Sequence, residues 1–241
     1  GAALCYTSRT TGHPKGVMYS HRAIVLNALT GCLPGILSLA PQDTVLPVVP
    51  MFHINAWCIP YGAPMAGARL VLPGPRLDGA SLHALMEDER VTVSAGVPTI
   101  WLGLMQYLEQ SGSRFTTMRR TLVGGTAMPA ALIAKFAEGY GVEVRHGWGM
   151  TETTAVATIG SLTPEEQALP PAERHAIVAR QGKSLFGPRF QGKLALRPES
   201  ITLLPAGATS SEPSLPGIIR QQQLLGQRTG APERGKLVVA A

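Results

Sequence analysis

The chain has 241 residues, of which 45% are hydrophobic and 15% are charged. This is the composition of a globular protein with a sizeable core, and it excludes an intrinsically disordered chain. The apolar stretches are interrupted well before the roughly 18 residues that a membrane span needs. No basic segment followed by an apolar one opens the chain, so we expect neither a transmembrane segment nor a secretory signal.

The net charge is +6, but its distribution argues against nucleic acid as a partner. From Pro188 onward there are seven basic and three acidic residues, so most of the excess lies in the last part of the chain. The remainder is nearly neutral and has no basic stripe with interleaved aromatic residues. The three cysteines, Cys5, Cys32 and Cys58, lie in apolar segments without metal-ligand spacing. They indicate reduced, buried thiols in a cytoplasmic protein.

Short apolar runs alternate with helical patterns in the first three quarters of the chain. The predicted elements, in chain order, are a strand at 2–6, a helix at 21–33 capped by Ser20, strands at 44–49 and 68–72, a helix at 78–89, a strand at 91–94, a helix at 99–110, a strand at 121–123, a helix at 130–138 and a strand at 142–145. This alternation predicts an α/β layered domain with a largely parallel sheet. Because the first strand begins almost at residue 1, we also expect a fragment of a longer chain.

The alternation stops near Gly187. Six prolines follow between Pro188 and the end of the chain, with little periodicity. We therefore predict an α/β domain over residues 1–187 and a divergent, weakly structured tail over residues 188–241.

A loop rich in hydroxyl groups and glycine follows the first strand, Tyr6-Thr-Ser-Arg-Thr-Thr-Gly-His-Pro-Lys-Gly-Val17. Backbone amides and hydroxyls can donate to phosphate oxygens, glycine lets the backbone approach closely, and lysine supplies a mobile positive charge. The residues with these properties are Thr7, Ser8, Thr10, Thr11, Gly12 and Lys15. The order is not that of a Walker A loop. The alternative is a hydroxyl-rich surface turn.

Four later segments also carry chemistry. They are Pro50-Met-Phe-His-Ile-Asn55, Ala95-Gly-Val-Pro-Thr99, Gly124-Gly-Thr-Ala-Met-Pro129 and His146-Gly-Trp-Gly-Met-Thr-Glu-Thr153. In the last of them an indole face suits a nucleotide base, a threonine hydroxyl suits a phosphate, and a carboxylate suits a hard cation. The alternative is a glycine-rich turn with an exposed Glu152, and His53 alone is as consistent with a core histidine as with a ligand.

In order and spacing, these five segments resemble the adenylate-forming (AMP-binding) superfamily of acyl-CoA synthetases, luciferases and adenylation domains. The versions around Trp148 and His53 most resemble medium- to long-chain fatty acid–CoA ligases, although a luciferase-like or aryl-acid substrate stays open. The resemblance implies part of the large N-terminal α/β domain, without the small C-terminal domain. It also implies a ligase that uses ATP, Mg²⁺ and coenzyme A to convert a carboxylic acid first to acyl-AMP and then to acyl-CoA.

The resemblance further implies roles for individual residues. The nucleotide would be bound by Thr7, Ser8, Thr10, Thr11, Gly12, Lys15, Gly124, Gly125, Thr126, Gly147, Trp148, Gly149 and Thr151. Catalysis would rest on Lys15, Thr151 and Glu152, and Glu152 would also hold Mg²⁺. The acyl group would contact His53, Val97 and Trp101. The apolar side chains near that pocket are interpreted either as a channel or as ordinary core: Met51, Ile54, Trp57, Val97, Ile100 and Trp101.

Three departures from the family pattern concern activity. The small C-terminal domain of the family, with its hinge and its catalytic lysine, has no counterpart in the sequence. Arg9 stands where the family has glycine, and its bulk is expected to crowd the phosphates. The family's ribose-binding Asp has no counterpart, since Ala231 ends the similar Arg228-Thr-Gly-Ala231. We therefore expect little or no ligase turnover. The alternatives are a non-catalytic nucleotide-binding remnant and a non-functional truncated product.

Overall fold

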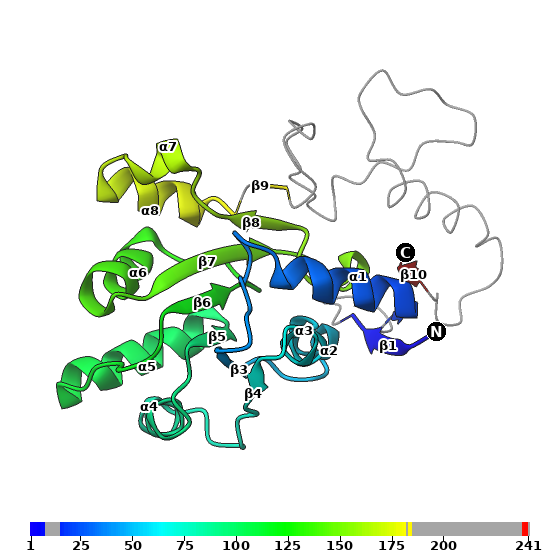
Figure 1. The fold of residues 1–241 in the computed structure, drawn as a ribbon, viewed down its shortest axis with the longest axis horizontal. Coiled ribbons are helices and arrows are strands. Elements are labelled where there is room, and N and C mark those ends of the chain that lie inside the picture. Colours follow the sequence, from blue (N-terminus) through cyan, green and yellow to red (C-terminus); the bar gives the residue numbers. More distant parts are fainter. Residues whose placement is uncertain (8–14, 182, 185–237, 241) are drawn as a thin grey trace.

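The computed structural model describes residues 1–7, 15–181, 183–184 and 238–240 (Figure 1). A seven-stranded sheet forms its centre, parallel from the first to the fifth strand and antiparallel beyond. The strands, in spatial order, are β4 (Arg69–Leu70), β3 (Thr44–Pro47), β5 (Val93–Gly96), β6 (Arg120–Val123), β7 (Glu143–Trp148), β8 (Thr158–Gly160) and β9 (Lys183–Ser184). The predicted α/β fold with a largely parallel sheet is thus confirmed.

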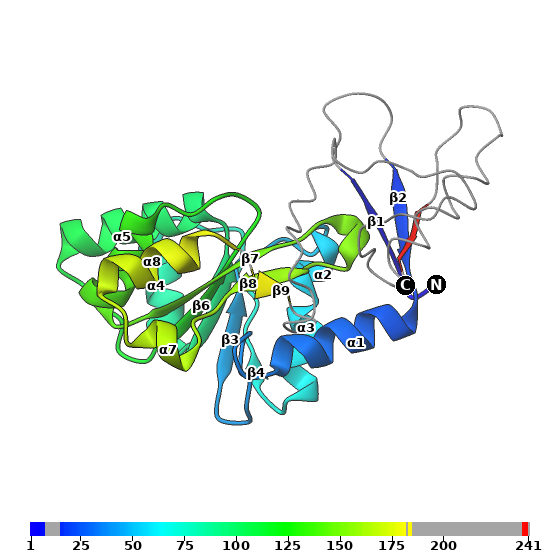
Figure 2. The ribbon, with the colours of Figure 1, turned by 90° about the horizontal axis from the view of Figure 1, so that it is seen from above.

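A smaller sheet contains the first two strands of the chain. Here β1 (Ala3–Tyr6) and β2 (Gly16–Tyr19) form an antiparallel hairpin, and β10 (Val238–Ala240) runs parallel to β2. Figure 2 shows the hairpin standing beside the sheet. β10 falls within the segment predicted to be weakly structured, and the rest of that segment lies outside the described residues.

Most of the helices connect strands along the chain and pack beside the large sheet. They are α1 (His21–Cys32), α2 (Ile54–Trp57), α3 (Ile59–Met65), α4 (Gly79–Asp88), α5 (Pro98–Ser111), α6 (Ala130–Ala134), the π-helix η1 (Lys135–Gly139), the 3₁₀ turn η2 (Thr151–Thr153), α7 (Pro164–Gln167) and α8 (Pro171–Ala179). Two predicted starts are confirmed, because the Ser20 side chain accepts from the amide of Ala23 at 3.0 Å and Asp78 accepts from Ser81 at 2.9 Å.

Several predicted boundaries were wrong. The strand expected at 142–145 continues to Trp148, and the one expected at 68–72 shrinks to two residues. The strand expected at 91–94 begins at Val93, because the hydroxyl of Thr92 accepts from the Thr44 amide at 3.0 Å. The helix expected at 130–138 is an α-helix only to Ala134 and continues as η1.

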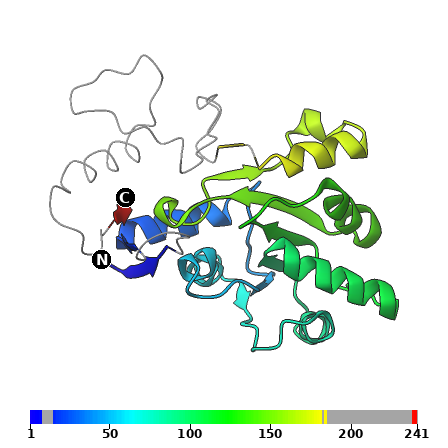
Figure 3. The same cartoon turned by 180° about the vertical axis from the view of Figure 1, so that it is seen from behind.

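Helices lie against both faces of the sheet (Figures 2 and 3). One face packs against α4, α5, α6 and α8, and that core includes Leu46, Leu82, Met86, Trp101, Leu104, Phe136 and Val178. The other face packs against α3 and the segment after α1, and that core includes Ile36, Leu37, Val45, Ile59 and Ala63. Neighbouring residues of β3 point to opposite cores, as the two-residue period of a strand requires.

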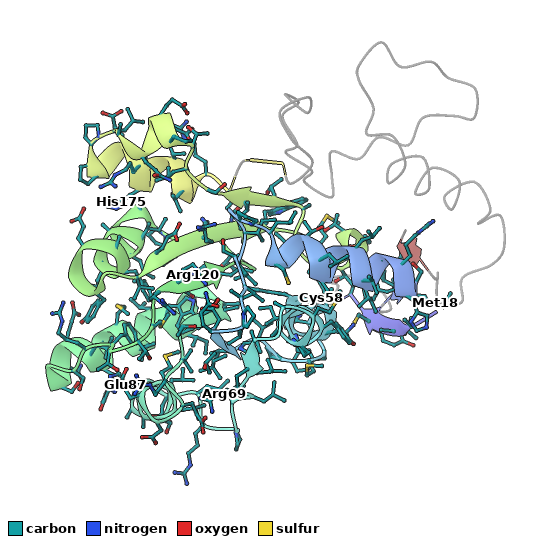
Figure 4. The ribbon with its side chains drawn as sticks, in the orientation of Figure 1. Met18, Cys58, Arg69, Glu87, Arg120 and His175 are labelled. Atoms are coloured by element: carbon teal, nitrogen blue, oxygen red, sulfur yellow. The ribbon has the colours of Figure 1, made fainter. Side chains whose placement is uncertain are left out.

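Asp43 sets the register at the amino ends of the parallel strands. This carboxylate is 3% exposed. It accepts from the hydroxyl of Thr92 at 2.7 Å and pairs with Arg120 at 3.0 Å, whose position Figure 4 marks. These contacts join the starts of β3, β5 and β6. Since a buried charge is tolerated only when it is paired and hydrogen-bonded, Asp43 fixes how these strands align and therefore where their carboxyl ends meet.

Arg90, two residues beyond the end of α4, offers a test of backbone strain. It is exposed with a φ of 53°, and Val91 N bonds to Met86 O at 2.8 Å in the αL helix ending that normally uses glycine. Arg90→Gly is expected to stabilise the protein by about 1 kcal/mol. Gly112→Ala, after α5, makes the opposite change and is expected to destabilise the protein. Gly112 has a φ of 69°, and no atom lies within 4 Å of a Cβ there, so the effect comes from backbone strain alone. Urea unfolding would contradict the prediction if Arg90→Gly lowered the midpoint.

Candidate nucleotide and acyl site

The candidate residues follow the carboxyl ends of four neighbouring parallel strands. His53 follows β3, Val97 follows β5, Gly124 follows β6, and Trp148 ends β7. Carboxyl ends of parallel strands meet at one edge of a sheet, where open α/β sheets bind their ligands. The fold therefore brings these sequence segments, which lie far apart along the chain, to one side of the molecule.

The phosphate-loop candidate spans the turn of the β1–β2 hairpin. Its two described ends, Thr7 and Lys15, are joined by a bond from Thr7 N to Lys15 O at 2.9 Å, and Lys15 N lies 3.3 Å from the Thr7 hydroxyl. The loop is thus closed at its base. Ser8, Arg9, Thr10, Thr11 and Gly12 lie outside the described residues.

The two glycines after β6 make close approaches that a side chain would block. A Cβ on Gly124 would lie 3.1 Å from Gly147 O and 3.3 Å from Cη2 of Trp57. Gly125 has a φ of 83°, and a Cβ there would lie 3.2 Å from Cγ1 of Val97. Three of the sequence segments therefore meet around these glycines, and Thr126 beside them is exposed.

The segment after β3 contains a left-handed turn that sequence reasoning missed. Five consecutive non-glycine residues, Ile54 to Cys58, have φ between 50° and 59°. Left-handed helix costs roughly 1–2 kcal/mol per L-residue, so packing must compensate. Ile54, Ala56 and Cys58 are buried, and Figure 4 shows Cys58 between α3 and the hairpin marked by Met18. Strain of this kind concentrates at functional sites.

His53 and Trp101, both predicted to contact the acyl group, lie in different surroundings. His53 is exposed, and its ring is 4.9 Å from that of the exposed Phe52. Trp101 is 0% exposed and lies in the large core, edge-on to Phe136 at 6.2 Å. A Cβ on Gly96 would come within 2.7 Å of the indole of Trp101. Of the two interpretations of Trp101, this packing is that of a core residue, and its contact with substrate stays a prediction.

The loop that ends β7 is held by bonds within it and by one bond from the hairpin. Met150 N donates to the hydroxyl of Thr153 at 2.9 Å. The hydroxyl of Tyr19, on β2, donates to the carbonyl of Thr151 at 2.5 Å. Tyr19 had no predicted role, although a buried phenol in an apolar strand signals a hydrogen-bond partner elsewhere.

The surroundings of Glu152 are compatible with a carboxylate that would bind Mg²⁺ together with substrate phosphates. Its side chain is half-buried, and among the described residues it makes no hydrogen bond or ion pair. The described part of the chain contains no group of three or more His, Cys, Asp or Glu suited to a metal. Mg²⁺ is commonly held by one or two carboxylates together with substrate phosphates and water, so a single protein carboxylate is enough for such a site.

His146, on β7, braces the loop after β6. It is 0% exposed, and its Nε2 lies 3.2 Å from the donating amide of Met128 and 2.6 Å from the side-chain nitrogen of Gln181. Burial lowers the pKa of this imidazole below the ordinary 6.5. The folded protein therefore favours the neutral imidazole of His146.

This burial predicts a pH dependence of stability. His146 is protonated more readily in the unfolded chain than in the folded protein. The contribution of the neutral ring to the free energy of unfolding is therefore complete above about pH 6.5 and declines as the pH falls below that value. One proton changes the stability by at most about 1.4 kcal/mol per pH unit. Urea unfolding at about pH 7.5 and about pH 5.5 measures this. His146→Gln should flatten the dependence, and His21→Gln, an exposed position at the start of α1, should not. Equal slopes in wild type and His146→Gln would contradict it.

A parallel sheet with glycine-rich loops at its carboxyl edge is typical of a nucleotide-binding α/β domain. The family model described as AMP-binding enzyme matches residues 1–197. The chain belongs to this AMP-binding enzyme family. In the described residues no helix combines the length and apolarity that crossing a bilayer requires.

Relatives of known name agree with this assignment. The chain is 49% identical over 186 residues to a medium-chain-fatty-acid–CoA ligase of Ectopseudomonas oleovorans, covering 77% of this chain and 34% of the relative. It is 52% identical over 179 residues to a long-chain-fatty-acid–CoA ligase of Thermus thermophilus, covering 74% and 33%. The chain thus spans about a third of the length of these relatives.

Solved structures have the same fold. The N-terminal domain of FACL13 from Mycobacterium tuberculosis superposes with a TM-score of 0.59 at 31% identity, covering 66% of this chain and 39% of that one. The o-succinylbenzoate coenzyme A synthetase of Bacillus subtilis, in complex with AMP, gives 0.57 at 29% identity and covers 67% and 32%.

Proposed function

We propose that this chain carries the nucleotide-binding part of a fatty acid–CoA ligase, which uses ATP to convert a fatty acid to acyl-AMP and then to acyl-CoA. The observation that carries the proposal is that the segments of His53, Val97, Gly124 and Trp148 lie at the carboxyl ends of four neighbouring parallel strands. The names of the relatives, medium- and long-chain-fatty-acid–CoA ligases, support the same reaction class and a substrate of medium to long chain.

The proposed nucleotide site divides into two ends. The exposed loop at Gly125 and Thr126, together with the half-buried Trp148, would hold the base. The hairpin loop between Thr7 and Lys15 would hold the β- and γ-phosphates, and the Thr151 hydroxyl the α-phosphate. Bound Mg²⁺ would neutralise phosphate charge during the attack, with Glu152 as its protein ligand. No side-chain nucleophile is required, because positioning and electrostatic stabilisation dominate such transfers.

The proposed acyl side lies where Trp57 and Val97 approach the glycines after β6. These apolar side chains exclude water from the carboxylate that attacks the α-phosphate. Cys5, Cys32 and Cys58 are free thiols, which fits the reducing cytoplasm as the proposed location.

A second candidate, nucleotide binding without turnover, is favoured by Arg9. The family pattern expects glycine at this position of the loop, and Arg9 puts a bulky residue there. We infer that wild-type turnover is low and that Arg9→Gly strengthens Mg·ATP binding by removing this bulk.

Calorimetric titration with Mg·ATP and pyrophosphate release with C6–C18 fatty acids test both candidates. The ligase proposal predicts Mg·ATP binding and fatty-acid-dependent pyrophosphate release that Arg9→Gly increases. Binding without pyrophosphate release in either protein supports the second candidate. A folded chain, shown by cooperative thermal unfolding, that binds no nucleotide overturns both.

A further inference from the structure

Tyr19 links the hairpin to the loop that contains Thr151 and Glu152. It is the last residue of β2 and is 0% exposed. Its hydroxyl donates to the Thr151 carbonyl at 2.5 Å across 132 residues of sequence. The ring packs in a small core with Cys5, Val17, Ile24, Ile54 and Ala155. Tyr19 thus joins two segments proposed to act on the same triphosphate.

Tyr19 is held in place by the pairing of β2 with β1. β2 begins at Gly16, immediately after Lys15, and Tyr19 is paired with Ala3 on β1. A four-residue strand that is paired along its length cannot change the distance between its ends appreciably, which is roughly 10 Å at about 3.4 Å per residue. The hydroxyl of Tyr19 therefore has a fixed position relative to the base of the phosphate loop.

The segment that Tyr19 contacts has few hydrogen bonds to other elements, although Thr154 and Ala155 are buried. η2 is a single 3₁₀ turn, and the following Thr154 and Ala155 have strained φ values of 54° and 80°. The bonds of Thr153 stay within the turn. Among the described residues, the bond from Tyr19 is the one hydrogen bond by which another element reaches residues 151–155.

The phenol of Tyr19 is suited to permanent donation. Burial raises its pKa far above the ordinary value, and the neighbouring Cys5, Cys58 and Glu152 raise it further. The hydroxyl therefore keeps its proton at every physiological pH. The carbonyl of Thr151 is in turn the acceptor of a partly buried bond. A fully buried polar group left unsatisfied costs roughly 1–3 kcal/mol, so loss of this bond is expected to cost less.

We propose that Tyr19 is a positioning residue that sets Thr151 and Glu152 at a fixed distance from Lys15, so that one Mg·triphosphate can contact all three. The proposal rests on the proposed function for the identity of the ligand. It assigns Tyr19 no contact with the nucleotide. It predicts that loss of the hydroxyl weakens binding of the metal–triphosphate end and leaves binding of the base end unchanged.

The test compares Tyr19→Phe with wild type and with Tyr107→Phe, which makes the same chemical change on α5. Calorimetry gives the affinities for Mg·ATP and for adenosine, and hydrogen exchange gives the protection of the amides of residues 151–154. For Tyr19→Phe we expect Mg·ATP binding about 10-fold weaker, adenosine binding within about twofold of wild type, and exchange at 151–154 about 10-fold faster. Tyr107→Phe should match wild type.

Equal weakening for both ligands would reduce Tyr19 to a structural role and overturn the proposal, as would unchanged exchange at 151–154. If wild type binds no nucleotide, the proposed function fails, and the exchange result alone decides whether Tyr19 orients the turn. If Tyr19→Phe does not fold, 4-aminophenylalanine at position 19 keeps a weaker donor in the same place. This variant should also weaken Mg·ATP binding more than adenosine binding, by a smaller factor than Tyr19→Phe. Equal weakening of both ligands would again overturn the proposal.

Discussion

Gly149→Ala is expected to abolish measurable Mg·ATP binding and to destabilise the protein by about 2–3 kcal/mol. A Cβ on Gly149 would overlap the carbonyl oxygen of Ala155 and would lie 2.5 Å from its carbonyl carbon and 3.0 Å from Cα of Val156. All three atoms belong to the backbone, so no rotamer change relieves the collision. The loop that presents Trp148 and Thr151 would have to move as a whole.

Gly139→Ala is the matched control for this change, because no atom lies within 4 Å of a Cβ at Gly139. It should leave Mg·ATP affinity as in wild type. Calorimetry and urea unfolding of the two variants separate the local collision from the general effect of adding a methyl group. An affinity of Gly149→Ala within about twofold of the control would show that this loop does not bind the nucleotide.

Glu152→Gln is expected to weaken Mg·ATP binding about 30-fold while leaving adenosine binding unchanged. The substitution keeps the size of the side chain and removes the negative charge that a hard cation prefers. Because Glu152 makes no ion pair among the described residues, its loss should leave no opposite charge there unpaired and the stability close to that of wild type.

Titration of Mg²⁺ at fixed ATP checks the role of Glu152 directly. Wild type should need less Mg²⁺ for half-maximal ATP binding than Glu152→Gln. Glu138→Gln is the control, since Glu138 lies 3.7 Å from His175 on α8, which Figure 4 shows far from the hairpin. An identical Mg²⁺ requirement in wild type and Glu152→Gln would exclude Glu152 as a metal ligand.

Much of the framework was predictable from local patterns. Ser20 was expected to cap a helix and Asp78 to begin one, and both side chains accept a backbone bond at a helix start. Alternating strands and helices predicted the parallel sheet, and parallel strands place their carboxyl ends together. The common edge at which the segments of His53, Gly124 and Trp148 lie follows from this fold class. Each of these inferences depends on residues a few positions apart, whose physical preferences are local.

Other features depend on contacts between distant segments and had no local signal. The left-handed turn from Ile54 to Cys58 contains no glycine, so propensity argued against it, and burial of its side chains outweighs the strain. Trp101 fitted a channel or a core equally well by type, and only the packing around it distinguishes them. The bond from Tyr19 to Thr151 is likewise invisible in either segment alone.

The sequence by itself determined the fold class and the kind of ligand that its loops suit. It did so because backbone periodicity, capping and the chemistry of phosphate, base and carboxylate act over a few neighbouring residues. The tertiary structure alone decided which side chains meet: Trp57 against Gly124, His146 beneath Met128, and Tyr19 bonded to Thr151. The physical reason is that burial and long-range hydrogen bonds arise only when distant segments pack together, and their sum decides which local strains the chain accepts.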